Sequence, residues 1–311
     1  MNAWSRYLVV AVALAALAFV LGSYQTDVYR KLLLWITLAL SYNFLFGVAG
    51  QVAFSHFTFY GIGAYAIVIL MFKVGLPLAF AAPLGVALCV ALALAVAIPA
   101  TRLEGFYLAL ATLAFAQLFV VMLNEGGDVT GGTGGLASYR LPDIFGLRVS
   151  GPWYTIVIVL LLLATHAVLA RLEASHFGRA CRAVRDDAEA AQASGIDVRR
   201  TKVLAYAITS ALAGVAGMVY AFVDNTVNPP IFGLENAFLL LFMVIVGGSG
   251  RQAGAIIGAV LLYLLPFVLS PLIGHHHALV FGLVMVAVVL FQPRGLIGLW
   301  DRFGPARQRL S

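Results

Sequence analysis

The side chains of this sequence best suited to acid–base or metal chemistry are its six histidines. Three of them, His275–His277, are adjacent, and a histidine cluster can indicate a metal site. Adjacent residues of an extended segment point in different directions, however, and no acidic or cysteine partner lies nearby. His166 lies within an apolar run, where packing or hydrogen bonding between helices is the simpler role. No catalytic residue, metal site or cofactor is therefore predicted.

The thirteen carboxylates all lie in loops or close to the ends of apolar runs. They are Asp27, Glu104, Glu125, Asp128, Asp143, Glu173, Asp186, Asp187, Glu189, Asp197, Asp224, Glu235 and Asp301. A carboxylate inside hydrocarbon is costly, and proton- or sodium-driven carriers often retain one because it holds the coupling ion. The pattern argues against a proton-coupled carrier, although backbone carbonyls and hydroxyls alone can bind sodium.

The three lysines exclude one route of nucleotide hydrolysis. A phosphate-binding P-loop requires a lysine followed directly by serine or threonine, and none of Lys31, Lys73 and Lys202 has such a neighbour. The chain therefore does not hydrolyse ATP by that route. If it works in an ATP-driven process, another polypeptide must supply the nucleotide site.

The elements that carry these side chains must be membrane spans. Of the 311 residues, 62% are hydrophobic and 10% charged, with a mean hydropathy of +1.00, whereas soluble domains are about 25% charged. Such a chain needs a lipid bilayer as its solvent, which excludes a soluble enzyme, a secreted scaffold and a disordered protein. We predict an all-α polytopic membrane protein that forms a single domain over residues 1–311.

About ten apolar runs approach the ~20 residues that one crossing requires. They are Tyr7–Ser23, Leu32–Phe46, Phe54–Phe72, Leu78–Ala100, Gly105–Asn124, Trp153–Ala170, Val203–Val223, Ala237–Gly248, Ala253–Leu269 and Ala278–Phe291. The eighth run is short for a full crossing. The glycine-rich stretch Gly47–Gly63 carries Gln51, Ser55 and His56, so we expect a broken helix there, at a place that protein or water surrounds.

The basic residues predict the orientation. If the polar segment Arg171–Lys202 and the tail after Phe291 are cytoplasmic, ten crossings also place the N-terminus inside. Five basic residues then lie outside, namely Arg30, Lys31, Lys73, Arg140 and Arg148, which leaves 14 of the 19 on the inner side. This bias follows the positive-inside rule, although Arg30 and Lys31 oppose it.

Pairs of small residues spaced four apart predict close helix packing. Gly254 and Gly258 form one pair, and Ala213 and Gly217 form another. Such faces let helices approach closely in lipid. They suit packing within one chain or between two chains, and we favour the first.

The polar segment Arg171–Lys202 is long for a simple connection and is mixed in charge. It favours a helix from Arg179 to Ser194. Six alanines in this stretch have short side chains, so a partner can approach much of the helix backbone closely. Gly195 is expected to end the helix, as C-terminal glycines do. A solvated interfacial helix is the alternative that the charge pattern alone favours.

Glu189-Ala190-Ala191 followed by Gly195 resembles the EAA-x-x-x-G loop of ABC importer permeases. A longer run adds further matches and is similar to LivM-type branched-chain amino-acid permeases. The matching residues are Gly178, Arg179, Ala180, Ala183, Val184, Arg185, Asp186, Asp187, Glu189, Ala190, Ala191, Gly195 and Ile196. Further segments extend the resemblance over roughly residues 30 to 300, among them Gly47–Tyr65, Gly105–Gln117, Thr130–Leu136 and Gly247–Gly258.

The resemblance implies a permease subunit in a bacterial inner membrane that imports branched-chain or related small amino acids by alternating access. Its partners would be a second homologous permease, two ABC ATPases that bind the loop at about 171–202, and a periplasmic solute-binding protein. Related permeases serve urea or short amides, so the solute stays open. An ATP-independent secondary carrier is a further alternative.

Four polar side chains in or near the spans are candidates for lining the translocation path. They are Gln51, Ser55, Thr112 and Gln117. Each carries a hydroxyl or amide group that can hydrogen-bond a solute. Each can equally satisfy a neighbouring helix.

Overall fold

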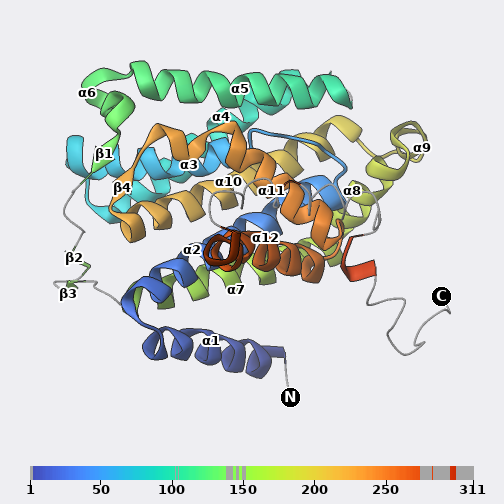
Figure 1. The fold of residues 1–311 in the computed structure, drawn as a ribbon. Helices are drawn as coiled ribbons and strands as arrows, with labels where there is room; N and C mark the ends of the chain where they lie inside the picture. Colours follow the sequence, from blue (N-terminus) through green and yellow to red (C-terminus); the bar gives the residue numbers. More distant parts are fainter. Residues whose placement is uncertain are drawn as a thin grey trace.

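A computed structural model describes residues 3–101, 103, 105–137, 143–144, 147–148, 152–273, 282 and 295–298. It shows long helices that run side by side (Figure 1). They are α1 (Ala3–Val20), α2 (Ser23–Asn43), α3 (His56–Val68), α4 (Leu78–Ala100), α5 (Phe106–Glu125), α7 (Pro152–Ala174), α10 (Val198–Asp224), α11 (Leu234–Gly247) and α12 (Gln252–Ile273). The chain is an all-α polytopic membrane protein, as predicted.

Within the described residues, seven helical stretches are long and apolar enough to cross a membrane. Helices occupy nine of the ten predicted positions. The tenth, Ala278–Phe291, lies outside the described residues except for Gly282, so the number ten stays a prediction. Two boundaries were wrong. The second span begins at Ser23 rather than Leu32 because polar partners accommodate Arg30 and Lys31 within the helix. The eighth begins at Pro229, and its 19 residues make it long enough to cross.

The predicted break between the second and third spans is present. Helix α2 runs into a π-helical turn, η1 (Phe44–Val48), and α3 begins at His56 after a non-helical stretch. A second π turn, η2 (Ile69–Lys73), ends α3. The break is thus shorter than the glycine-rich stretch suggested, because Gly61 and Gly63 are helical.

Small residues let α3 and α10 touch through their backbones. A Cβ on Gly63 would lie 2.0 Å from the Gly214 carbonyl oxygen, and one on Gly217 would lie 1.8 Å from that of Tyr60. The same holds for α11 and α12, where a Cβ on Gly258 would lie 1.8 Å from the Met243 oxygen. The prediction that these small residues pack within the chain is confirmed.

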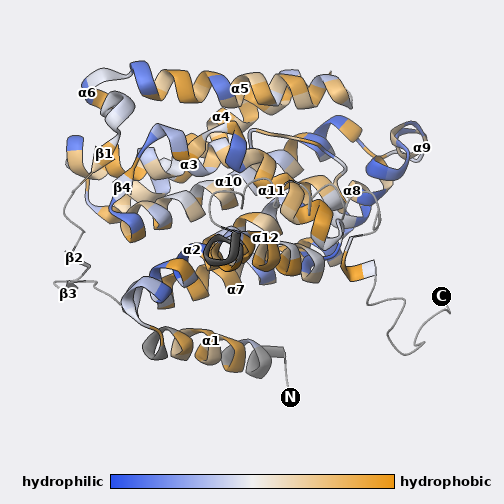
Figure 2. Ribbon diagram, viewed as in Figure 1, coloured by the Kyte–Doolittle hydropathy of each residue, from blue (hydrophilic) through white to orange (hydrophobic). Residues whose placement is uncertain are grey.

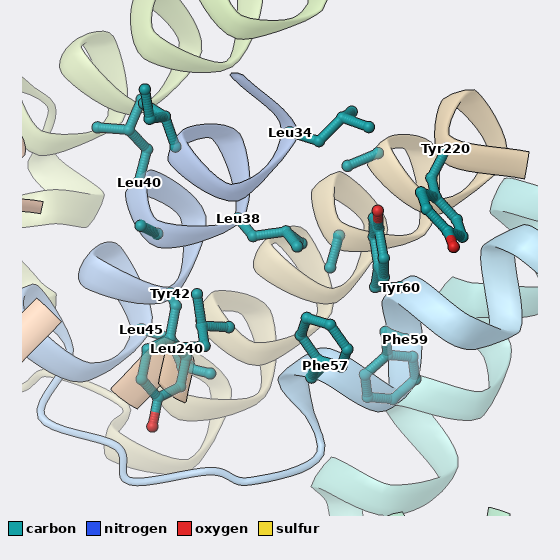
Figure 3. Packing of buried hydrophobic residues seen from close by; sticks show 14 of the residues in the cluster. Leu34, Leu38, Leu40, Tyr42, Leu45, Phe57, Phe59, Tyr60, Tyr220 and Leu240 are labelled. Atoms are coloured by element: carbon teal, nitrogen blue, oxygen red, sulfur yellow. The ribbon is translucent and has the colours of Figure 1, made fainter. Parts of the chain in front are cut away.

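Aromatic and aliphatic side chains fill the space around α3. Figure 3 shows Phe57 and Tyr60 of α3 between α2 and α10, and the ring centroids of Tyr60 and Tyr220 lie 5.3 Å apart. Helix α2 is mostly buried, whereas α5 lies at the periphery and is mostly exposed (Figure 1). Apolar residues dominate the helices (Figure 2), and large apolar side chains such as Leu118 of α5 and Leu160 of α7 are exposed, as contact with lipid allows.

The connections separate two ends of the bundle (Figure 1). One end carries the short elements α6 (Gly127–Thr130), η3 (Gly132–Gly134) and η4 (Pro229–Phe232), and two antiparallel ribbons. These ribbons pair β1 (Leu136–Ala137) with β4 (Thr226–Val227) and β2 (Asp143–Ile144) with β3 (Leu147–Arg148). The other end carries the first residues of α1 and the whole polar segment, so both lie on the same side, as the predicted topology requires.

Candidate coupling site

The polar segment folds into two short helices, α8 (His176–Asp186) and α9 (Ala188–Ala193). The prediction of one helix from Arg179 to Ser194 was wrong at its start and in its middle. Asp187 interrupts the helix with extended backbone angles, φ −157° and ψ 108°. The two helices project from the end of the bundle (Figure 1).

Side-chain caps explain both helix starts. Ser175 Oγ accepts a hydrogen bond from the Gly178 amide at 3.3 Å, and Asp187 Oδ1 accepts one from the Ala190 amide at 2.9 Å. A cap of this kind stabilises a helix by about 1 kcal/mol. Asp187 therefore begins α9 instead of continuing α8.

Two glycines fix where the pair of helices begins and ends. A Cβ on Gly178 would lie 2.3 Å from the Leu172 carbonyl oxygen, so glycine lets α8 lie directly against the end of α7. Gly195 follows α9 with a φ of +85°, a left-handed conformation that favours glycine. The prediction that Gly195 ends the helix is confirmed.

The surface of α9 carries short side chains and charged groups. Glu189 and Ala190 are exposed, while Ala191 is buried against the chain itself. Asp186, Asp187 and Arg179 are also exposed. A partner can therefore approach the backbone of α9 closely and meet charged groups around it.

Arg185 connects α8 to the break between α2 and α3. Its Nη1 donates a hydrogen bond to the Gly47 carbonyl at 2.6 Å, while Nε and Nη2 donate to Asp186 Oδ1 at 2.9 and 2.7 Å. Gly50, with a φ of +69°, leaves room for the Arg185 side chain, since a Cβ there would lie 2.4 Å from its Cγ. Charge-assisted hydrogen bonds of this kind are stronger than neutral ones.

Two further contacts hold the break from other directions. Gln51 Nε2 donates to the Lys202 carbonyl at the start of α10, at 3.1 Å. Asn43 Oδ1 accepts from the Gly250 amide in the connection between α11 and α12, at 2.8 Å. The break is thus in direct contact with α8 through Arg185, with α10 through Gln51 and with the α11–α12 connection through Asn43.

Three of the four candidate path residues make contacts within the chain. The hydroxyls of Ser55 and Tyr206 form a hydrogen bond, and Thr112 Oγ1 accepts from the Phe54 amide at 3.1 Å. With Gln51 they surround the break, whereas Gln117 lies apart on the exposed face of α5.

Sequence reasoning missed Asn43 and Tyr206 as members of this polar cluster. Both are buried, and a polar group within an apolar run was the signal that could have identified them. The same signal applies to Ser41, whose Oγ lies 2.8 Å from His56 Nε2.

Acid, cysteine and histidine side chains are scattered over the described part of the chain. No three of them there lie close enough to hold a metal ion. His275–His277 lie outside the described residues.

The apolar helices form a multi-pass membrane bundle, and a capped, exposed helix pair lies at one of its ends. The chain belongs to the family described as "Branched-chain amino acid transport system / permease component", whose model matches residues 24–289. The resemblance to ABC transport permeases of the LivM type is thereby confirmed.

Curated relatives cover nearly the whole chain. The high-affinity branched-chain amino acid transport system permease protein LivM of Escherichia coli (strain K12) is 29% identical over 94% of this chain and 74% of its own length. The protein of the same name from Salmonella typhimurium is 30% identical over 93% and 73%. The permease protein LivH of Escherichia coli (strain K12) is 25% identical over 84% and 90%. No solved structure matches the chain.

Proposed function

We propose that this chain is one permease subunit of an ATP-driven importer that moves branched-chain or related small amino acids into the cell by alternating access. The family and the names of the relatives support the solute class. The observation that carries the coupling is the Arg185 hydrogen bond to Gly47, because it joins the exposed polar segment to a break inside the membrane domain.

The proposed assembly contains a second, homologous permease, two ABC ATPases and a periplasmic solute-binding protein in a bacterial inner membrane. Two distinct permease proteins among the relatives, LivM and LivH, support the second permease. The segment from Gly178 to Gly195 receives an ATPase, which alone hydrolyses ATP. The short, exposed side chain of Ala190 supports this docking, because it lets a partner reach the α9 backbone.

In the proposed cycle, closure of the ATPase dimer displaces α9 and α8. Arg185 transmits that displacement to Gly47 near the end of η1. The break then lets α2 and α3 change their relative orientation. We propose that Gln51, Ser55 and Thr112 border the path near this break. Gln117, an amide on an otherwise apolar exposed face, meets the path or the second permease, since an amide facing lipid is unfavourable.

The test is solute uptake into proteoliposomes that contain this chain, its homologous permease, the ATPases and the binding protein. We expect leucine to accumulate only when ATP is supplied on the ATPase side. Accumulation of urea without leucine would keep the importer and change its solute. Uptake by this chain alone, independent of ATP, would overturn the proposal.

A further inference from the structure

A cavity of about 310 Å³ lies between α2, α3, α10, α11 and α12, at the end of the bundle opposite the coupling site. Its volume is at the lower limit of ordinary small-ligand sites. It therefore suits a small metabolite rather than a peptide. None of the four candidate path residues lines it.

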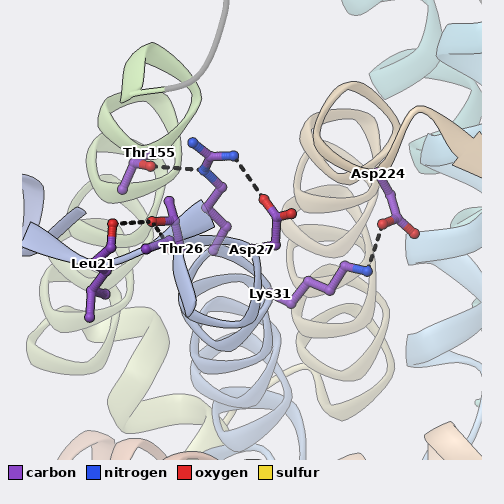
Figure 4. A network of polar contacts seen from close by, with 8 residues as sticks. Leu21, Thr26, Asp27, Lys31, Thr155 and Asp224 are labelled. Carbon is purple, nitrogen blue, oxygen red and sulfur yellow. Dashed lines mark hydrogen bonds and ion pairs between the residues drawn. The ribbon is translucent and has the colours of Figure 1, made fainter. Parts of the chain in front are cut away.

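An ion pair forms part of the cavity wall. Lys31 Nζ of α2 lies 2.6 Å from Asp224 Oδ1 of α10, and the Tyr220 hydroxyl donates to Asp224 Oδ2 at 2.6 Å. Figure 4 shows the pair bridging the two helices. The side chains of Lys31 and Asp224 are 39% and 24% exposed, so both charges remain accessible to a solute.

This pair retains capacity for more partners. A lysine ammonium has three donors, and each carboxylate oxygen has two acceptor sites. Lys31 can therefore bind a second carboxylate while Asp224 binds a second ammonium. Asn236 adds an amide to the wall, and its Nδ2 is held by a hydrogen bond to the Ile231 carbonyl at 2.7 Å.

Much of the remaining wall is aromatic or aliphatic. Trp35 and Phe57 stack with centroids 5.1 Å apart, and Leu239 and Leu262 contribute aliphatic surface. Such a lining favours the burial of a branched aliphatic side chain. The cavity thus combines paired opposite charges with an apolar lining.

We infer that this cavity binds a zwitterionic amino acid with an apolar side chain. Its carboxylate binds Lys31, its ammonium binds Asp224, and its side chain packs against Trp35 and Leu239. The inference rests on the proposed function and deepens it, because a charge pair of this kind favours amino acids over urea or short amides.

The test is equilibrium binding of radiolabelled leucine to the full chain in lipid nanodiscs, without ATPases or ATP. We expect Lys31→Met and Asp224→Asn each to weaken binding at least tenfold. Asp27→Asn is the matched control, because it removes the neighbouring Arg30–Asp27 ion pair on the same helix and should leave binding unchanged. Isovalerate, isoamylamine and urea, which each lack one or both charges, should not displace leucine.

A variant that keeps the ion pair guards against misfolding as the explanation. Leu239→Trp fills the cavity and should abolish leucine binding while the chain stays monodisperse. Absence of leucine binding by the unaltered chain, or unchanged binding in all three cavity variants, would overturn the inference. Intact ATP-driven leucine uptake in those variants would overturn this site and leave the proposed importer standing. Leucine binding by the unaltered chain without ATP-driven uptake by the assembly would support this site and overturn the proposed importer.

Discussion

At the scale of single residues, Arg185 is the most informative side chain. It is the contact through which α8 reaches the break, 138 positions earlier in the sequence. Lysine keeps the charge but lacks the planar fork that serves Gly47 and Asp186 together. The contact therefore depends on arginine itself and not on positive charge alone.

We expect Arg185→Lys and Arg185→Ala to lower ATP-driven leucine uptake about tenfold or more, since a hydrogen bond to a charged group contributes roughly 1.5–3 kcal/mol. ATP hydrolysis by the assembled transporter should persist, because the variant uncouples it from transport. The measurement is uptake per ATP hydrolysed in proteoliposomes. Arg200→Ala, an exposed arginine at the start of α10, is the control. Full uptake in both Arg185 variants would contradict the coupling role.

Cys181 gives a prediction about pH. It lies on the buried face of α8, and burial raises the pKa of its thiol from 9.0 to about 11, an effect that Arg182 nearby partly opposes. The folded state therefore favours the neutral thiol. This contribution to stability is complete below about pH 9 and is lost as the pH rises through about 11.

We expect the alkylation rate of Cys181 by iodoacetamide to keep rising between pH 9 and about 11 in the folded chain. A Cys89→Ser background isolates this thiol, since these are the two cysteines of the sequence. Mass spectrometry of the labelled chain provides the rates. A rate that levels off near pH 9, like that of a free thiol, would show that Cys181 is not buried as described.

At the scale of elements, the close backbone contact between α3 and α10 provides a stringent test of the fold. We expect Gly217→Ala to lower the unfolding free energy by about 1–3 kcal/mol, because its new methyl group meets the Tyr60 carbonyl and overpacks the helix contact. Gly134→Ala is the matched control, since its Cβ meets nothing within 4 Å. Thermal unfolding monitored by fluorescence-detected gel filtration measures both variants. Equal stability of the two would contradict the close approach.

The elements also show what local sequence can and cannot predict. Apolar runs, the glycine end at Gly195 and the small-residue pairs were readable because each depends on neighbouring residues. Asp187 was missed as a cap, although an aspartate directly before Ala188 and Glu189 is a known start signal. The contact of Gln51 with Lys202 was not predictable, because local patterns do not show which distant segments pack together.

At the scale of the whole molecule, the ion pairs explain the two basic residues that oppose the positive-inside rule. Arg30 lies 3.1 Å from Asp27 and also donates to Thr155, while Lys31 is paired with Asp224. Their charges are therefore compensated locally. The topology predicted from the remaining basic residues does not conflict with these two.

That topology can be measured with single cysteines on a background in which Cys89 and Cys181 are serine. We expect Ser194→Cys, in the coupling site, to react with a membrane-impermeant maleimide only after the cells are opened. Asp128→Cys, at the opposite end, should react in intact cells. Both positions are exposed, so access to the reagent depends on the side of the membrane. The reverse pattern would invert the orientation.

The π turn η1 at the end of α2 rotates the following residues about the helix axis, relative to where a regular α-helix would place them. A π turn holds one residue more than an α turn, and one residue of an α-helix corresponds to about 100° of rotation and 1.5 Å of rise. Conversion of η1 to regular α-helix would therefore turn the chain beyond it by about a quarter of a revolution. Arg185 donates a hydrogen bond to the Gly47 carbonyl inside this turn. In the proposed cycle, a small linear displacement of α8 would therefore become a large angular change at the start of the break.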